Sequence, residues 1–168
     1  FIHMLKHCRD HGGDVVVINP AKEPGLVRFA VPKSPGSMLR GGDEIASDWL
    51  QPRIGADIAL FKGLAKAVLA LGAEDREFIA AHTNGLDAFT ADLDALSWDA
   101  IIAACGLARA DIERVAALYA RKRNVVFAWG MGMTHHLHGV AHGEAIANLP
   151  LLRVMLARRY AGLLPPRR

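Results

Sequence analysis

Residues 125–140 read VVFAWGMGMTHHLHGV, an apolar run followed by a glycine-rich turn and three histidines. A short, continuous apolar run is typical of a strand buried on both faces, as in a parallel sheet. Glycines directly after such a strand let the backbone turn tightly and let a ligand come close. Residues 14–20, DVVVINP, repeat the apolar run and end at Asn19-Pro20. Ligands of open α/β sheets bind beyond the carboxyl ends of the strands, so Asn19 lies at a candidate site.

Amphipathic segments alternate with these two runs and predict helices. The predicted helices cover residues 1–9, 54–72, 74–85, 97–106, 111–123 and 139–157. Ser97 is a good N-cap and Gly106 a good stop for one of them, whereas Pro150 predicts a kink or a break in the last. Strands that alternate with helices indicate an α/β fold with a parallel sheet.

Residues 20–54 interrupt this alternation with a Pro/Gly-rich stretch inside what we expect to be a single α/β domain over residues 1–168. The pieces LVRFAV and EIASDWL predict an edge strand and a short helical turn. Long loops within compact domains are uncommon and often functional. A functional loop and a variable surface excursion both fit this segment.

Composition narrows the class of protein. The chain has 168 residues, is 52% hydrophobic and carries a formal net charge of +3. No basic stripe interleaved with aromatics is present, which argues against nucleic acid, while an anionic small ligand fits the mild excess. Two cysteines without a CxxC motif exclude a zinc ribbon and favour a reducing, cytoplasmic setting. No apolar run has the roughly 18 residues of a membrane helix.

The glycine turn and its histidines allow several interpretations. A GxG turn after a strand suits phosphate binding and equally suits a plain tight turn. His135 and His138 lie three residues apart and would share a helical face, but no HEXXH motif is present, and we expect no metal site. A polar rim and a general acid–base role for one histidine both remain open.

Four segments in order, DVVVINPAKEPG, QPRIGADIALFKGLAKAVL, SWDAIIAACGLARADIERVAALYA and VVFAWGMGMTHHLHGVAHGEAIANLPLLR, resemble one family. Together they are similar to the alpha (catalytic) subunits of molybdopterin-dependent oxidoreductases of the formate dehydrogenase and dimethyl sulfoxide reductase type, and most of all to the formate-dehydrogenase-like branch. The resemblance implies an internal fragment with an incomplete, Rossmann-like, doubly wound parallel sheet and helices on both faces. It also implies two molybdopterin guanine dinucleotides holding Mo or W in the parent enzyme. A 4Fe–4S cluster would belong to the parent and not to this chain.

The resemblance carries over to particular residues as a cofactor-binding set and implies no catalytic residue here. Gly55 and Asp57 match the family's Gly-x-Asp segment, in which the carboxylate accepts hydrogen bonds from the guanine N1–H and amino group. Asn19, followed by Pro20, takes the place of an acidic residue near the guanosine end. The turn that matches the family's WGMG-type turn comprises Gly130, Met131, Gly132, Met133 and Thr134, followed by His135 where the family often has Gln.

One departure concerns the residues after Leu152-Arg153. The family commonly has glycines there, and this chain has Val154, Ala157, Arg159 and Tyr160. The resemblance implies part of a guanine-dinucleotide-binding domain, partnered by the remainder of the parent subunit and without turnover alone. The alternative is a non-catalytic α/β scaffold or partner-binding module that has lost the ligand. Missing sheet neighbours would favour self-association through an exposed edge.

Overall fold

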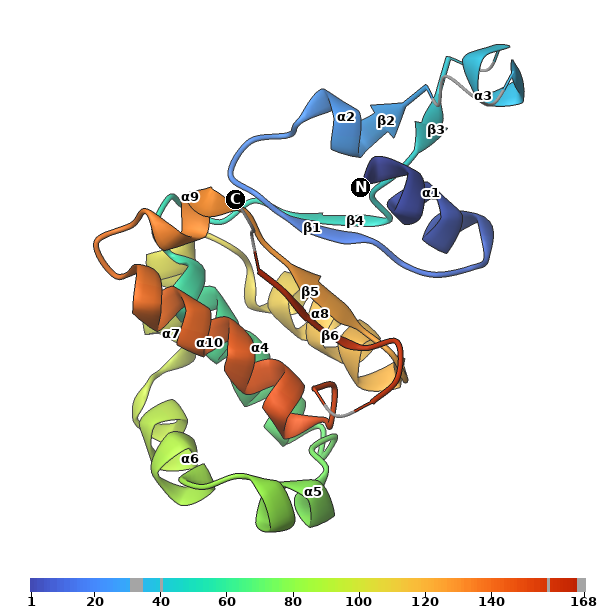
Figure 1. The fold of residues 1–168 in the computed structure, drawn as a ribbon. Helices are drawn as coiled ribbons and strands as arrows, with labels where there is room; N and C mark the ends of the chain where they lie inside the picture. The colour runs from blue at the N-terminus through green and yellow to red at the C-terminus, as the bar shows by residue number, and fades with distance from the viewer. Residues whose placement is uncertain (31–34, 40, 157, 166–168) are drawn as a thin grey trace. The chain divides into compact units, whose positions relative to one another are not determined.

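The computed structural model describes residues 1–30, 35–39, 41–156 and 158–165 (Figure 1). Contacts group the chain into two compact units, Phe1–Pro52 and Arg53–Arg168. Each unit contains a pair of parallel strands flanked by helices, so the predicted α/β class is confirmed. The expectation of a single domain with residues 20–54 as an excursion stays a prediction, and residues 31–34 and 40 of that segment lie outside the described residues.

The first unit is built around two strands that are far apart in the sequence. Its elements in order are α1 (Ile2–Asp10), β1 (Val16–Ile18), α2 (Pro24–Val27), β2 (Arg28–Phe29), α3 (Pro35–Leu39), β3 (Asp43–Glu44) and β4 (Asp48–Leu50). β1 and β4 pair in parallel, and β2 and β3 pair antiparallel. Val15, Val17 and Ile45 form the buried core of this unit.

Two predictions for this unit are wrong. The end of the segment EIASDWL, Asp48–Leu50, forms β4 instead of a helical turn, because pairing with β1 in the register Ile18↔Leu50 buries Leu50 almost completely. Such a long-range pairing overrides local propensity. β1 is also not buried on both faces. Val17 is buried while Val16 and Ile18 are half-exposed, as expected when alternate side chains point to opposite faces and one face is covered.

The second unit is mainly helical. Its elements are α4 (Asp57–Ala70), α5 (Arg76–His82), α6 (Leu86–Ala95), α7 (Trp98–Cys105), α8 (Arg109–Arg121), β5 (Val126–Ala128), α9 (Met131–Thr134), α10 (Gly139–Leu152) and β6 (Gly162–Leu164). α4 is the central helix and packs against α6, α7, α8 and α10 (Figure 1). The described residues contain no helix long and apolar enough to cross a membrane.

The helix ends in this unit follow the sequence closely. Ser97 caps α7 by accepting a hydrogen bond from the Ala100 N–H at 3.1 Å, and Gly106 ends that helix at a φ of 73°. Pro150 lies near the end of α10, which stops at Leu152, so the predicted break falls within three residues of the proline. Caps and stops were predictable because they depend on neighbouring residues in the chain.

β5 departs from the prediction that VVFAW is buried. Val126 is 56% exposed, and Phe127 is half-buried with its ring edge-on to Tyr119. Within the described part of the chain β5 pairs with β6 alone, in the register Val126↔Gly162. A strand with one neighbour and one covered face keeps part of its apolar surface exposed.

Candidate functional site

The residues that the resemblance implies fall in both units. Asn19 and Pro20 belong to the first, at the carboxyl end of β1, and the others belong to the second. The Asn19 Nδ2 donates to Glu23 Oε1 at 2.7 Å, and its Oδ1 accepts from the Ala21 N–H at 2.9 Å. The Pro20 carbonyl accepts from Gln51 Nε2 at 2.9 Å. Both the nitrogen and the oxygen of the Asn19 side-chain amide therefore make hydrogen bonds within the turn after β1.

Asp57 begins α4. Its side chain is half-exposed, does not cap the helix, and makes no hydrogen bond or ion pair among the described residues. The N-terminus of a 14-residue helix favours a carboxylate there, because the helix dipole is positive at that end. Capping, the alternative explanation for an acidic residue in a first turn, does not apply to Asp57. Its oxygens are available to accept hydrogen bonds from a ligand.

Gly55 lies two residues before Asp57. Its backbone φ is 79°, in the left-handed region that favours glycine. A Cβ added at Gly55 would lie 3.9 Å from the imidazole of His136. The ring of His136 lies against that of His142, which is 2% exposed, with the ring centres 5.1 Å apart and the planes inclined by 59°. Gly55 therefore lies near His136, which closely follows the glycine turn in the sequence, more than seventy residues after Gly55.

The turn itself is a short helical turn that starts at Gly130. Residues 130–132, 134 and 135 are exposed, and Met133 is half-buried. Thr134 Oγ1 donates to the Met131 carbonyl at 3.0 Å, so its hydroxyl proton is used inside the turn. The Nδ1 of His142 donates to the Met133 carbonyl at 3.4 Å, which ties the turn to α10.

The glycines of the turn differ in what they do for the fold. A Cβ at Gly139 would come 2.4 Å from the Thr134 carbonyl oxygen, so packing demands glycine there. A Cβ at Gly130 or Gly132 would meet nothing within 4 Å, and neither has a positive φ. Nothing in the described residues requires glycine at 130 and 132. An approach by a ligand would supply such a reason.

The sequence interpretation gave no role to the pair His136–His142. It paired His135 with His138, yet both are exposed. His142 stands six residues after His136, a spacing that no helical rule joins, and the two meet because the loop folds back onto α10. The only sequence signal was a histidine among the apolar residues of a helix. The described residues contain no group of three or more His, Cys, Asp or Glu arranged to hold a metal ion.

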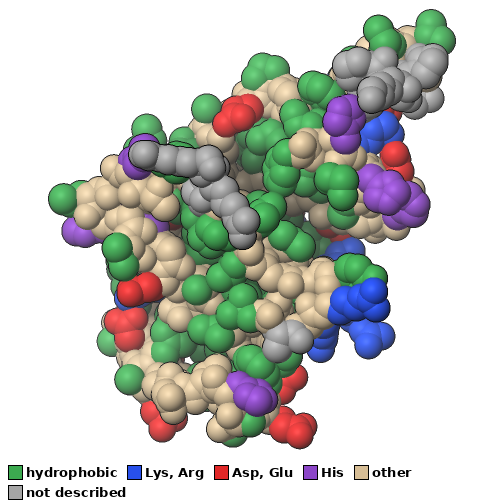
Figure 2. Space-filling view, viewed as in Figure 1, with side chains coloured by type: hydrophobic (Ala, Val, Ile, Leu, Met, Phe, Trp, Pro, Cys, Tyr) green, Lys and Arg blue, Asp and Glu red, His purple; other side chains and the backbone are tan. Residues whose placement is uncertain are grey.

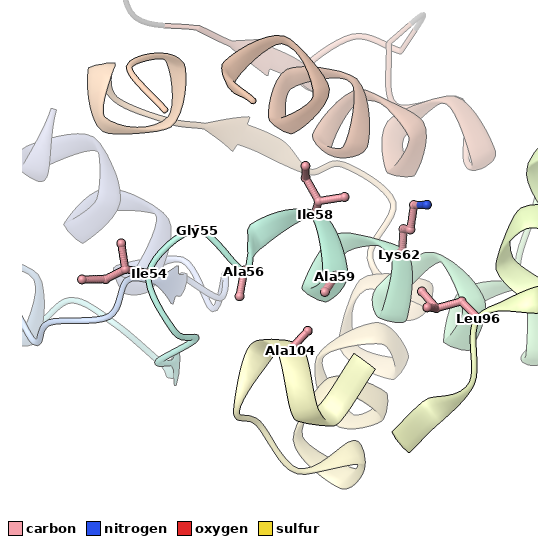
Figure 3. Close-up of a pocket in the computed structure, with 8 residues that line it drawn as sticks. All are labelled: Ile54, Gly55, Ala56, Ile58, Ala59, Lys62, Leu96 and Ala104. Carbon is pink, nitrogen blue, oxygen red and sulfur yellow. The ribbon is translucent and has the colours of Figure 1, made fainter. Parts of the chain in front are cut away.

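A surface pocket of about 400 Å³ lies beside this site (Figure 3). Its lining shares Gly55 and Ala56 with the segment before Asp57 and continues over Ala59 and Ala104, with Lys62 as its charged member. No residue of the glycine turn lines it. The pocket therefore adjoins the Gly55–Asp57 segment and does not include the glycine turn.

The elements described above define an α/β protein with parallel strand pairs flanked by helices. No protein-family model matches the sequence. The chain is 32% identical over 172 residues to the uncharacterized oxidoreductase Rv2900c of Mycobacterium tuberculosis, an alignment that takes in 99% of this chain and 22% of that protein. It is 25% identical over 113 residues to formate dehydrogenase H of Escherichia coli, with 67% of this chain and 16% of the enzyme covered.

A solved structure gives the same picture of the fold. Acetylene hydratase from Pelobacter acetylenicus matches 89% of this chain and 18% of its own chain, with a TM-score of 0.70 and 19% identity. The chain thus spans about a fifth of the length of the relatives it matches. The resemblance to oxidoreductases drawn from the sequence is confirmed at that level, and the formate-dehydrogenase-like branch stays a prediction.

Proposed function

We propose that this chain is part of a molybdopterin-dependent oxidoreductase of the formate-dehydrogenase-like branch and helps to bind the guanine dinucleotide part of the cofactor. The observation that carries the proposal is that Gly55 lies near His136, which closely follows the glycine turn, while Asp57, two residues after Gly55, has no partner among the described residues. The Gly55–Asp57 segment and the turn are the two segments that the sequence resemblance assigns to one cofactor. The oxidoreductase relatives support the same assignment.

The roles follow from the chemistry of each group. The Asp57 carboxylate accepts hydrogen bonds from the guanine N1–H and the exocyclic amino group, a bidentate contact that adenine cannot make. Gly130 and Gly132 leave room for a phosphate or pterin to approach the backbone, since no Cβ stands in the way. In this proposal the other residues of the turn lie beside the phosphate or pterin: Met131, Met133, Thr134 and His135. The cofactor, when bound, supplies redox chemistry at its molybdenum or tungsten.

Asp57 and Asn19 differ in how well they suit a guanine dinucleotide. Asp57 is half-exposed and unpartnered among the described residues, as a guanine acceptor should be. Asn19 fits less well, because Glu23 and the Ala21 N–H already satisfy its amide. We therefore assign guanine recognition to Asp57, and a role of Asn19 and Pro20, which belong to the first unit, stays a prediction. The remainder of a parent subunit would supply the rest of the pocket and the metal ligand, so we expect no turnover by this chain alone.

Isothermal titration with GDP, and with AMP as the control nucleotide, tests the proposal. We expect selective binding of GDP and a loss of at least tenfold in affinity in Asp57→Ala, because a carboxylate that accepts two hydrogen bonds contributes more than 1.4 kcal/mol. Asp99→Ala is the matched control, since Asp99 is also an acidic residue in a first helical turn. Equal binding of GDP and AMP, or an unchanged affinity in Asp57→Ala, contradicts the guanine assignment.

A second candidate is a non-catalytic α/β scaffold that has lost the ligand. Val154 and Tyr160 favour it, because they adopt φ values of 59° and 66° in a segment where the resembling family has glycines. At both positions the backbone has a left-handed conformation that glycine adopts easily, but the residue is not glycine. Of the other two such positions, Arg159 has no positive φ and Ala157 lies outside the described residues. The absence of guanine-selective binding in the titration supports this candidate.

A further inference from the structure

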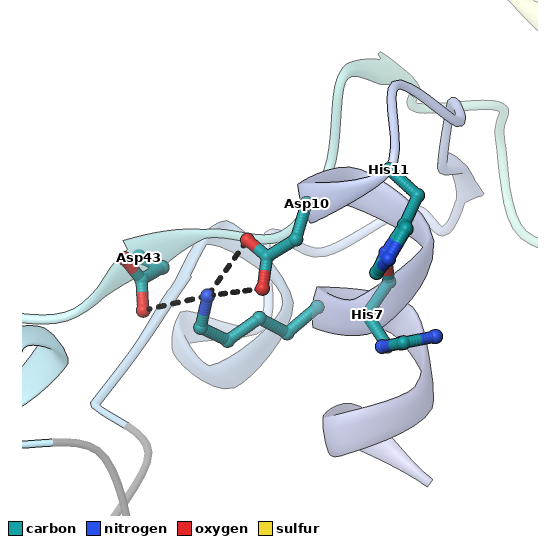
Figure 4. A network of polar contacts seen from close by, with 5 residues as sticks. His7, Asp10, His11 and Asp43 are labelled. Carbon is teal, nitrogen blue, oxygen red and sulfur yellow. Dashed lines mark hydrogen bonds and ion pairs between the residues drawn. The ribbon is translucent and has the colours of Figure 1, made fainter.

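Two exposed histidines, His7 in the last turn of α1 and His11 at its C-cap, lie one helical turn apart. The ring centres of His7 and His11 are 4.1 Å apart, and the rings are inclined by 48° (Figure 4). We propose that His7 and His11 bind a divalent transition-metal ion, with Cu²⁺ preferred and Ni²⁺ next. This site belongs to the first unit and is independent of the proposed nucleotide site.

The hydrogen bond of His11 leaves its second nitrogen ready to coordinate. His11 Nδ1 lies 2.8 Å from the His7 carbonyl oxygen, and a ring nitrogen at that distance from a carbonyl must carry the proton. The neutral imidazole then has its lone pair on Nε2. A backbone carbonyl that fixes the tautomer and orientation of a histidine is the usual support of a metal ligand. The ring of His7 has no hydrogen-bond partner among the described residues, so its nitrogens are also available.

The separation of the rings favours a right-angled ligand pair. With metal–nitrogen distances of about 2.0 Å, two imidazoles at 90° have ring centres about 4.5 Å apart, and the separation grows at the tetrahedral angle. The observed 4.1 Å is closer to the right-angled arrangement. Cu²⁺ and Ni²⁺ take square-planar or tetragonal nitrogen and oxygen sites, and Cu²⁺ has the highest affinity of the first-row dications. Water would complete the coordination.

The positively charged side chains near His7 and His11 are paired with carboxylates, which reduces their repulsion of a bound cation. Lys6 donates to both carboxylate oxygens of Asp10 at 2.7 Å and lies 3.4 Å from Asp43 (Figure 4). The carboxylate of Asp10 is thus occupied by the Lys6 ammonium. Arg9 Nη1 is held 2.9 Å from the Gly13 carbonyl and 3.6 Å from Asp14. The positive charges of α1 are therefore each matched by carboxylates.

The location of the pair adds a favourable field. His7 lies in the last turn of α1 and His11 is its C-cap residue. The C-terminus of a helix carries partial negative charge, which stabilises a cation bound there. Figure 2 shows histidine side chains at the surface of the first unit, and in α1 His3, His7 and His11 are the exposed ones. A metal ion can reach the pair without movement of the fold.

Titration of the full chain with Cu²⁺, followed by electron paramagnetic resonance, tests the site. All variants carry His3→Ala, because His3 is a further exposed histidine of α1 and could bind copper itself. We expect a Cu²⁺ signal with two coordinated histidine nitrogens. The affinity of this site should fall at least tenfold in His7→Ala and in His11→Ala. His82→Ala is the control at another exposed helix-end histidine and should leave the binding unchanged.

Histidines of the second unit could also bind copper, so a variant in which His135 and His138 are both alanine completes the set. Copper binding that survives in this variant and disappears in His7→Gln supports the proposal. Glutamine keeps a polar side chain on an exposed helical position, and circular dichroism should show unchanged folding. Copper binding that is equal in His7→Ala, His11→Ala and the parent, or that disappears with His135 and His138, overturns it.

Discussion

Arg153 joins three parts of the second unit, and its removal should weaken that unit markedly. Its Nε donates to the Ala73 carbonyl at 3.0 Å, and its Nη1 donates to the carbonyls of Tyr119 and of Lys122, the latter at 3.2 Å. The guanidinium also lies 5.2 Å from the centre of the Tyr119 ring. One side chain thus ties the end of α10 to the loop after α4 and to the last carbonyls of α8.

The expected size of the effect follows from these contacts. Three charge-assisted hydrogen bonds at about 1 kcal/mol each, after competition from water at a half-exposed side chain, give about 3 kcal/mol of unfolding free energy for Arg153→Ala. For a unit of this size that loss lowers Tm by about 12 °C. Arg153→Lys keeps the charge but cannot reach three separated carbonyls, so we expect it to lose about half as much.

Urea and thermal denaturation followed by circular dichroism measure these losses. Arg158→Ala is the matched control, because Arg158 is exposed and makes one hydrogen bond, to the Arg123 carbonyl at 2.7 Å. We expect this control to change the free energy of unfolding by less than about 0.5 kcal/mol. If Arg153→Ala were no more destabilising than Arg158→Ala, the role of Arg153 as a link between helices would be refuted.

Two further predictions concern a buried hydroxyl and a strained backbone. Burial raises the pKa of Tyr119, so the unfolded chain ionises first and stability should fall as the pH rises above about 10. Urea titrations between pH 8 and 11 should show a shallower fall in Tyr119→Phe, which also loses about 1 kcal/mol at neutral pH with its bond to the Leu149 carbonyl. Tyr160→Gly should be about 1 kcal/mol more stable than Tyr160→Ala, because alanine keeps the strain of a φ of 66° and glycine relieves it. Equal denaturation midpoints for these two variants would show that the backbone at Tyr160 is unstrained.

Most of the longer helices and their ends could be predicted from the sequence, whereas α6 (Leu86–Ala95) and short helices such as α9 were missed. The cap at Ser97, the stop at Gly106 and the first-turn position of Asp57 depend on residues within one helical turn, so local chemistry decides them. The resemblance to oxidoreductases likewise rests on the order of motifs along the chain, and the relatives support it. The alternation of helices with apolar runs was sufficient for the α/β class.

Strand pairing and the neighbours of the glycine turn were decided by tertiary structure. Asp48–Leu50 became a strand because β1 (Val16–Ile18), far earlier in the sequence, offered a parallel partner that buries Leu50. His136 meets His142 and Gly55 because a loop folds back onto α10 and past the start of α4. The sequence by itself determined the local elements, whose energies come from neighbours in the chain. Which distant segments share a surface was decided by burial and packing in the folded chain, which no local pattern records.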